Sequence, residues 1–600
     1  MSEEIKYLSR PSLKSEGKQK IIIIGAGIIG VCTAYYLTKH PNFNPEKYHI
    51  IILESREVAA GASGKAGGLL ASWAFPNMIV PLSFQLHQEL SDLYNGETNW
   101  DYRRLTTVSL EADVQDENIK FQEQRLNLLT REKELKNNFL RDSNSLSSIL
   151  SSNDDIGRNN NNGNNNGEGR HRHRRHRHLK EGILEHGDSD DGDDSDDEFE
   201  EDSDEDSEDE DEDEKLYFNA ANSMSGVISQ SSVNVNKNKK YMKDNNHQYN
   251  ANDDNMHNTL SARDRLSNSG SSINSILNPA TTASTTTMST TSITAPTAQD
   301  QYDIALPRDL DWIRRELVDN CSSLGNRDST AQVHPYKFTR FILQRAMESD
   351  CIDLILGKVV DVKIDDSRNK ATGIRYQPIK KMHEDASSDN IVDKENIVDI
   401  DGDGATKIII TTGPWTSELI KSCPISGLRA HSIIIKPNYP KNNGNPTQVS
   451  PYAIFTELKI NNNEYFSPEI YARRDEVYVC GEGDTLVKIP DSTKAVAYNE
   501  DKCEELYHYV SKISTPLSDG HIIKQQACYL PVLNVATSSG PLIGETNVNN
   551  LYIASGHSCW GINNAPATER IMSEIILEGE SKSADISLLN PKLYFDASAK

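Results

Sequence analysis

Three glycines near the start of the chain have the spacing that cradles a phosphate group. Gly25, Gly27 and Gly30 follow an isoleucine run that begins after Lys20, and an apolar, helix-like segment follows them. The first glycine permits a tight turn, the second lets a pyrophosphate approach the backbone, and the third lets the helix pack against the strand. Unpaired N–H groups at the helix start then face the phosphates. The predicted contacts of this dinucleotide turn are Gly25, Ala26, Gly27, Ile28, Ile29 and Gly30.

Glu54 closes the second strand of this unit. Residues 49–53 (HIIIL) are predicted to form a strand, and the carboxylate that follows can accept hydrogen bonds from ribose hydroxyls. Residues 60–73 then form a loop of small residues suited to wrapping a long cofactor, and the sequence holds no second glycine motif of this kind. This pattern favours FAD over NAD. Further predicted cofactor contacts here are Ser55, Ala62, Ser63, Gly67, Gly68 and Leu69.

Four segments carry a resemblance to a known family. They are residues 61–73 (GASGKAGGLLASW), 332–335 (QVHP), 411–417 (TTGPWTS) and 551–568 (LYIASGHSCWGINNAPAT). Together with the glycine turn, they resemble the amine-oxidising flavoproteins of the D-amino acid oxidase, glycine oxidase and sarcosine oxidase superfamily, especially fungal members whose substrates are unassigned. The resemblance spans both sides of a long insertion.

The resemblance implies further site residues. It places Val359 against the adenine through backbone atoms, and it places residues 411–417 and 551–568 beside the flavin. The cofactor contacts implied are Val359, Gly413, Trp415, Gly556, His557, Gly561, Ile562 and Asn563. The catalytic candidates are His557, Trp73 and Tyr529, and no metal is expected.

The resemblance also implies a reaction. A small amine or amino acid would transfer a hydride from the carbon beside its nitrogen to the flavin, and water would hydrolyse the resulting imine. Because a nicotinamide domain is not predicted, dioxygen is the expected oxidant of the flavin. A rival interpretation is a regulatory or membrane-trafficking protein that keeps FAD as a structural ligand and binds partners through its insertion.

Two positions depart from the family pattern. Leu530 stands where the glycine oxidase branch has an arginine that holds the substrate carboxylate, and Glu569 stands where a glycine is usual in the last helix. Leu530 is compatible with an amine that lacks this carboxylate, or with an anion held by another cation such as Arg473 or Arg429. Cys528 stands near the position from which sarcosine oxidases link the flavin covalently. A buried strand thiol is the preferred interpretation of Cys528, so non-covalent FAD is expected.

The predicted fold is α/β, with a Rossmann-like FAD-binding domain interleaved with an α+β substrate domain that has a mixed antiparallel sheet. The FAD-binding parts are expected at 1–76, 331–424 and 526–600, and the substrate parts at 77–142, 301–330 (a helix) and 425–525. Strands are predicted at 103–112, 351–364 and 408–412, helices at 310–318 and 336–347, and a hairpin at 470–481.

Residues 143–300 have the composition of a disordered acidic insertion. Residues 188–214 alone carry 21 acidic residues and no basic one, so most of the net charge of -27 belongs to this tract. The rest has an ordinary surface balance, which gives no reason to expect nucleic acid as a partner. Protein partners of the acidic insertion stay an open alternative.

Eight scattered cysteines and a polar N-terminus without a signal peptide favour a cytoplasmic protein, with peripheral endosomal association as an open alternative. The apolar run at 21–38 contains three glycines and begins with β-branched residues, so it is not expected to span a membrane.

Overall fold

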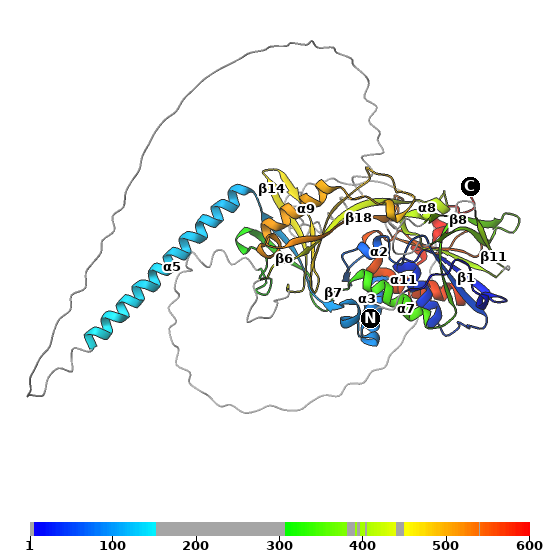
Figure 1. Cartoon of the computed structure of the whole chain (residues 1–600), viewed down its shortest axis with the longest axis horizontal. Coiled ribbons are helices and arrows are strands. Elements are labelled where there is room, and N and C mark those ends of the chain that lie inside the picture. The colour runs from blue at the N-terminus through cyan, green and yellow to red at the C-terminus, as the bar shows by residue number, and fades with distance from the viewer. Residues whose placement is uncertain are drawn as a thin grey trace, which may run out of the picture. The chain divides into compact units, whose positions relative to one another are not determined.

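The structure is a computed structural model that describes residues 5–151, 306–380, 391–392, 396–402, 405–439, 449–538 and 540–599. The chain divides into one unit of residues 1–123 and 259–600 and another of residues 124–258. Within the first unit, elements from the two ends of the chain are interleaved, as the blue and red ribbons of Figure 1 show. The cofactor motifs of both ends therefore belong to one unit.

The larger sheet of the first unit has nine strands. They are β1 (Gln19–Ile24), β2 (Tyr48–Glu54), β8 (Ile352–Asp365), β9 (Lys370–Lys380), β10 (Ile391–Val392), β11 (Val398–Asp401), β12 (Lys407–Ile410), β19 (Leu542–Glu545) and β20 (Leu551–Ser555). The order is β10-β9-β8-β2-β1-β12-β20-β19, with β11 paired to β9. Strands β8, β2, β1, β12 and β20 are parallel to one another. The strand order reverses at β1, where such sheets open a ligand crevice.

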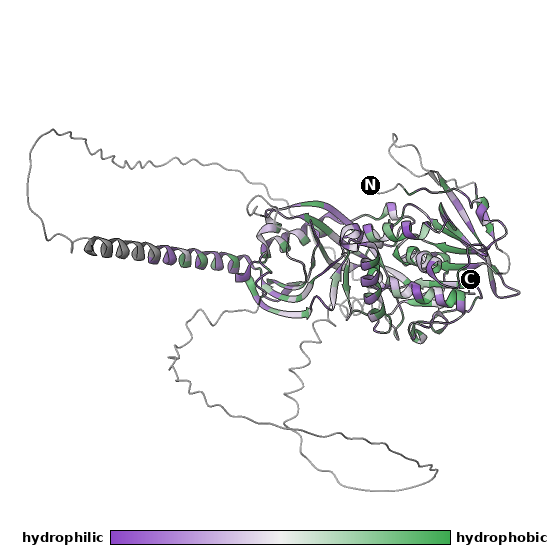
Figure 2. Cartoon of the chain, turned by 90° about the horizontal axis from the view of Figure 1, so that it is seen from below, coloured by the Kyte–Doolittle hydropathy of each residue, from purple (hydrophilic) through white to green (hydrophobic). Residues whose placement is uncertain are grey.

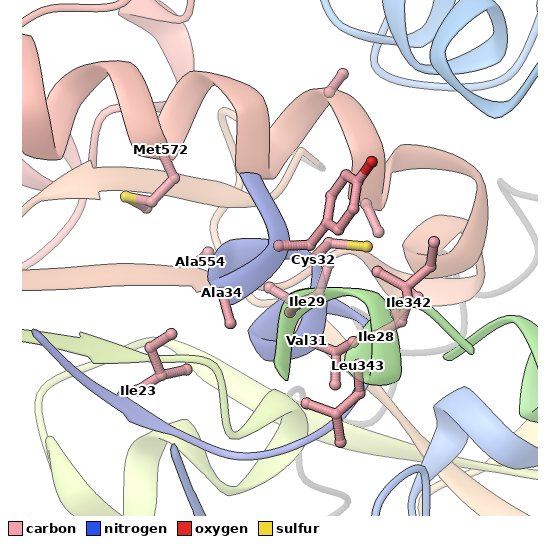
Figure 3. Packing of buried hydrophobic residues seen from close by; sticks show 14 of the residues in the cluster. Ile23, Ile28, Ile29, Val31, Cys32, Ala34, Ile342, Leu343, Ala554 and Met572 are labelled. Carbon is pink, nitrogen blue, oxygen red and sulfur yellow. The ribbon is translucent and has the colours of Figure 1, made fainter. Parts of the chain in front are cut away.

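Helices cover one face of this sheet. They include α1 (Ile28–Lys39), α3 (Val80–Tyr94), α7 (Pro335–Met347) and α11 (Gly561–Glu578), whose apolar side chains share one core with Ile21 and Ile23 of β1. Figure 3 shows Val31 and Cys32 of α1 between residues of α7 and α11. Helix α1 is buried on almost every side, so it is fixed firmly against β1.

Gly30 allows α1 to approach its strand. A Cβ atom at this position would lie 2.0 Å from the carbonyl oxygen of Gly25 and 2.6 Å from Oγ1 of Thr411. Gly25 itself adopts a φ of +108°, in the left-handed region that favours glycine. The first and third glycines of the motif are therefore required by the turn and by packing.

The second large sheet contains eight strands. They are β5 (Thr106–Asp113), β6 (Val318–Gly325), β13 (Ile425–Lys436), β14 (Tyr452–Asn461), β15 (Glu464–Phe466), β16 (Glu469–Ala472), β17 (Val477–Asp484) and β18 (His521–Leu533). The order is β18-β13-β17-β16-β14-β5-β6, with β15 paired to β14. One face packs against α9 (Glu500–Ile513). The other face carries Tyr471 and Tyr478, which belong to a separate apolar cluster.

A third sheet of three short strands connects to the cofactor loop. Its strands are β3 (Leu69–Ala71), β7 (Thr330–Gln332) and β4 (Arg103–Arg104), in that order. The remaining α-helices of the first unit are α2 (Ala62–Lys65), α4 (Gly96–Trp100), α8 (Thr416–Leu419) and α10 (Thr515–Ser518).

Most predicted elements agree with the structure, and the α/β class with mixed sheets is confirmed. Helix α7 and strands β8 and β12 lie within a residue or two of their predicted ranges, and β16 and β17 form the predicted antiparallel hairpin. The strand predicted at 103–112 is divided into β4 and β5. The domain boundaries stay a prediction.

The helix predicted at 310–318 is wrong. Leu310, Trp312 and Ile313 lie in turns, a 3-10 helix covers Arg315–Leu317, and β6 begins at Val318. All three apolar side chains are buried, and the Trp312 indole N–H donates to Ser450 Oγ at 3.0 Å. Long-range pairing of β6 with β5 therefore overrides the local helical spacing.

Helix α5 (Asp116–Ser151) continues past position 143, where the sequence places the start of the acidic insertion, and that boundary stays a prediction. The rest of the predicted insertion, including the acidic tract, lies outside the described residues. The part of α5 whose side chains are described is largely hydrophilic, as the purple ribbon of Figure 2 shows. No described helix combines the length and apolar character needed to cross a membrane.

Glu569 lies in the packed interface between α11 and α1. Its carboxyl group is fully buried, and Oε2 accepts a hydrogen bond from the Thr33 hydroxyl. Oε1 has no hydrogen-bond partner among the described residues. Burial raises the pKa of this carboxyl from 4.5 to about 8, so the protein folds around the neutral acid.

We expect Glu569→Gln to stabilise the protein increasingly as pH rises from about 4.5 to about 8. In this window the unfolded carboxyl ionises while the folded one keeps its proton, which costs the wild type about 1.4 kcal/mol per pH unit. The measurement is the unfolding midpoint of both proteins at several pH values. A difference that stays constant from pH 5 to pH 8 would contradict the buried neutral acid.

Candidate cofactor and substrate site

A cavity of about 400 Å³ lies at the carboxyl ends of the central parallel strands. Gly25 and Gly27 line it after β1, Glu54 lines it at the end of β2, and Gly413 lines it after β12. This is the crevice that the reversal of strand order at β1 creates. The three segments come together because the strands that precede them, β1, β2 and β12, are neighbours in one sheet.

The glycine turn leaves the cavity open at the start of α1. Gly27 immediately precedes α1, and a Cβ atom there would meet Ser63 Oγ at 3.1 Å and no other protein atom within 4 Å. The backbone N–H of Ile28 donates to Ser63 Oγ at 2.9 Å, which ties the small-residue loop to the helix start. The helix dipole and the free N–H groups there favour a phosphate.

Backbone hydrogen bonds hold Glu54 at the cavity wall. Its Oε2 accepts from the Ala26 N–H at 2.9 Å, and its Oε1 accepts from the Arg56 N–H at 2.9 Å. Burial raises the pKa of this carboxyl, and the two hydrogen bonds partly offset the rise. A carboxylate has about four acceptor positions, so Glu54 retains capacity for ribose hydroxyls.

Two further glycines leave room along the cavity. Gly413 has a φ of +56° and no protein atom within 4 Å of the place where its Cβ would be, and the nearest atom for Gly561 is His557 Cβ at 3.7 Å. The Trp415 indole N–H donates to the Pro490 carbonyl at 2.7 Å, which fixes the ring at the wall. The open glycine cradle, the helix start and the buried acid fit FAD.

His557 lines the cavity as a neutral imidazole. Burial lowers the pKa of this histidine to about 3, so the ring carries no charge near neutral pH. Its Nε2 lies 3.2 Å from Thr568 Oγ1. A neutral ring can donate one hydrogen bond, but it cannot offer a positive charge to a flavin. A catalytic role for His557 stays a prediction.

The predicted cofactor residues divide into two groups. Those that line the cavity are Gly25, Gly27, Ile28, Ile29, Glu54, Ser55, Ala62, Ser63, Val359, Gly413, Trp415, His557, Gly561 and Ile562. Those outside the lining are Ala26, Gly30, Gly67, Gly68, Leu69, Gly556 and Asn563. Members of the second group position the first: the Asn563 side chain accepts from the Ala71 N–H at 2.9 Å, which joins α11 to β3.

Residues 489–493 line the cavity and were missed from the sequence. They form an irregular segment between β17 and α9, so no periodic pattern marks them. The predicted catalytic residue Tyr529 is buried outside the cavity lining, and its hydroxyl lies 3.0 Å from the carbonyl oxygen of Val487 and 3.2 Å from that of Lys488. The structure therefore places Tyr529 where it positions this segment.

Leu530 lines the cavity, and the two arginines considered as its substitutes are engaged elsewhere. Arg429 forms a buried ion pair with Asp484 at 3.1 Å. Arg473 pairs with Glu476 at 2.7 Å and donates to the Ala66 carbonyl at 2.6 Å. Both guanidinium groups already have carboxylate partners.

The sequence model of one family, described as DAO, FAD dependent oxidoreductase, matches residues 20–152 and 298–575. The chain is 48% identical over 605 residues to "Putative oxidoreductase TDA3" of Saccharomyces cerevisiae, covering 98% of both chains. It is 26% identical over 577 residues to "Putative oxidoreductase C1F5.03c" of Schizosaccharomyces pombe, covering 96% of this chain and 98% of that protein. A solved glycine oxidase from Bacillus cereus aligns with a TM-score of 0.48 and 14% identity, covering 95% of this chain and 97% of that one.

We expect Gly27→Val to abolish flavin binding and leave the fold intact, because the added methyl groups enter the ligand space. Gly30→Ala is the matched comparison, since its methyl group meets protein backbone and should lower stability instead. Flavin absorbance near about 450 nm per mole of protein and the unfolding midpoint distinguish the two effects. A Gly27→Val protein with full flavin content would show that the cofactor does not lie here.

Proposed function

Since this chain belongs to the FAD-dependent oxidoreductase family, we propose that it oxidises the C–N bond of a small amine that lacks a carboxylate beside the nitrogen. Bound FAD supplies a hydride acceptor, the imine product is hydrolysed by water, and dioxygen restores the oxidised cofactor. Leu530 in the cavity wall is the observation that carries the choice of substrate class.

The charges near the cavity support an amine over an amino acid. A carboxylate taken out of water needs a cation with good hydrogen-bond geometry, and a guanidinium fork is the strongest such partner. Leu530 provides neither charge nor donor, and Arg429 and Arg473 are neutralised by Asp484 and Glu476. Leu530 itself would therefore leave the carboxylate of an amino acid unpaired. Lys358 also lines the cavity, and its ammonium group donates to the Asp491 carbonyl at 3.2 Å.

Lys65 is a further cation that could in principle pair with a substrate carboxylate. Its ammonium group donates to the Ala527 carbonyl at 2.7 Å, and no carboxylate pairs with it among the described residues. Burial lowers the pKa of Lys65, so its environment already disfavours the charged form. The side chain lies beside Cys528 and is not part of the cavity lining.

The chain's own contribution is positioning and electrostatics. Gly561 and Ile562, at the start of α11, line the cavity. The N–H groups and the positive end of this helix favour negative charge on a flavin held there.

The rival function, a structural FAD in a regulatory or trafficking protein, draws its support from Leu530. The glycine-lined space at Gly413 and Gly561 favours an enzyme, because a structural ligand needs no open room beside its reactive ring. Loss of the flavin absorbance when an amine is added under anaerobic conditions would distinguish an enzyme from a protein with a structural FAD. Cytoplasmic location and endosomal association stay predictions.

We expect amines without a carboxylate, including polyamines, to reduce the flavin under anaerobic conditions at least about tenfold faster than glycine, D-alanine or sarcosine. The reason is that an unpaired carboxylate is costly to bury. Stopped-flow absorbance of the holoprotein measures these rates. Lys65→Met and Arg473→Ala serve as paired variants. Fast reduction by glycine or D-alanine that is lost in either variant would show that another cation holds a carboxylate, and would overturn our choice.

We also propose that FAD is held without a covalent bond. Cys528 is buried in β18, and burial raises the pKa of its thiol to about 11, which keeps it protonated. Flavin attachment requires a nucleophilic thiolate at the ring edge. The Cys528 side chain does not line the cavity.

Acid precipitation should release all of the flavin into the supernatant from both the wild type and Cys528→Ser. The measurement is flavin fluorescence of the supernatant and of the protein band after denaturing electrophoresis. A fluorescent band in the wild type that disappears in Cys528→Ser would establish a covalent link.

A further inference from the structure

We propose that the carboxylate of Glu469 and the aromatic rings of Trp73, Phe455 and Tyr471 form a subsite that binds the ammonium group of an organic cation beside the cofactor cavity. This inference rests on the proposed function, because it names the charge that the amine substrate carries when it arrives.

Strand register brings the subsite together on one face of the second sheet. Glu469 of β16 is opposite Phe455 of β14 and opposite Cys480 of β17, and Tyr471 is opposite Tyr478. Opposed residues in antiparallel strands share a face, and alternate residues along one strand do so as well. The carboxylate is therefore surrounded by rings on the face away from α9.

Glu469 is a half-buried acid without a cation partner among the described residues. Its Oε2 accepts a hydrogen bond from the Tyr471 hydroxyl and lies 3.7 Å from Cys480 Sγ. No lysine, arginine or histidine pairs with it among the described residues, and burial raises the pKa of its carboxyl. An isolated interior carboxylate is costly unless a positive charge accompanies it.

A continuous line of rings leads from the cofactor cavity to this acid. Trp560 follows the cavity residue Cys559, and its ring centroid is 6.1 Å from that of Trp73. Trp73 lies 6.4 Å from Phe455, and Phe455 lies 6.2 Å from Tyr471. These contacts place Glu469 and the cavity in neighbouring space.

The partly covered side chains show that this space is open. Glu469, Phe455, Trp73 and Trp560 are half-buried, and Cys559 is exposed, although the segment lies in the interior of the unit. The Glu469 charge also contributes to the raised pKa of the Cys559 thiol, so the two groups are near each other. The half-buried side chains therefore keep accessible surface next to Cys559, although none of them belongs to the lining of the cavity.

The chemistry of this surface selects an alkylated ammonium ion. Ring faces attract a cation within about 6 Å through their quadrupole, and a carboxylate adds an ionic hydrogen bond. A metal ion would need more oxygen ligands than Glu469 alone provides. An amino-acid carboxylate would meet repulsion from Glu469 in addition to the missing arginine at Leu530.

The test is titration of the flavin-loaded protein with tetramethylammonium chloride, followed by calorimetry and by the flavin difference spectrum. This ion has no lone pair on nitrogen and cannot be oxidised as an amine. Glu469→Gln keeps the size of the side chain and removes its charge, and exposed Glu457→Gln on β14 removes the same charge elsewhere. tert-Butanol and sodium acetate are the neutral and anionic probes.

We expect saturable binding of tetramethylammonium that weakens on the order of tenfold in Glu469→Gln and severalfold in Trp73→Leu, with Glu457→Gln unchanged. Equal affinity of the wild type and Glu469→Gln, or equal binding of tert-butanol, would overturn the subsite. If Glu469→Gln loses its flavin, the affinity for tetramethylammonium is measured instead in Trp73→Leu and in Glu469→Asp, which retains the charge. Wild-type affinity in Trp73→Leu would then overturn the proposal.

Failure of the subsite and failure of the proposed function give different results. If an amine reduces the flavin but tetramethylammonium does not bind, the subsite is wrong and the oxidase function stands. If tetramethylammonium binds through Glu469 and no amine reduces the flavin, the cation subsite stands and the oxidase function is wrong.

Discussion

The contact between Gly30 and the carbonyl oxygen of Gly25 is the constraint on which the rest of the site depends. Because no side chain fits between them, α1 begins directly at the end of β1 and points its free N–H groups into the cavity. The same helix is held by α7 and α11 on its outer sides. A wider separation of α1 from β1 would move the phosphate cradle and also the C-terminal helix.

The order of strands explains how distant segments build one cavity. Strands β12 and β20 follow β1 in the sheet, so the turn at Gly413 meets the strand end at Ser555, whose hydroxyl donates to the Gly413 carbonyl at 3.0 Å. The Thr416 hydroxyl also donates a hydrogen bond to Ser555 Oγ at 3.0 Å. These bonds join the two segments that form this part of the cavity wall.

The sequence predicts the cofactor half of the site better than the substrate half, for a physical reason. Gly25 and Gly30 belong to one strand–turn–helix unit with a recurrent spacing, so local sequence reveals them even though Thr411 also crowds both positions. Residues 489–493 reach the cavity through an irregular segment that long-range contacts position. The wrong helix at 310–318 has the same cause, because pairing of β6 with β5 is invisible to local periodicity.

The substrate class that we propose rests on the distribution of charge and not on the fold. The family fold by itself does not choose between an amine and an amino acid as the substrate. Here Asp484 and Glu476 neutralise the neighbouring arginines, whereas Glu469 has no cation. Interior charges are stable when they are paired, and our proposal assigns the missing positive charge beside Glu469 to the bound ligand. Under this proposal, an amine that arrives protonated supplies that charge and requires no arginine at position 530.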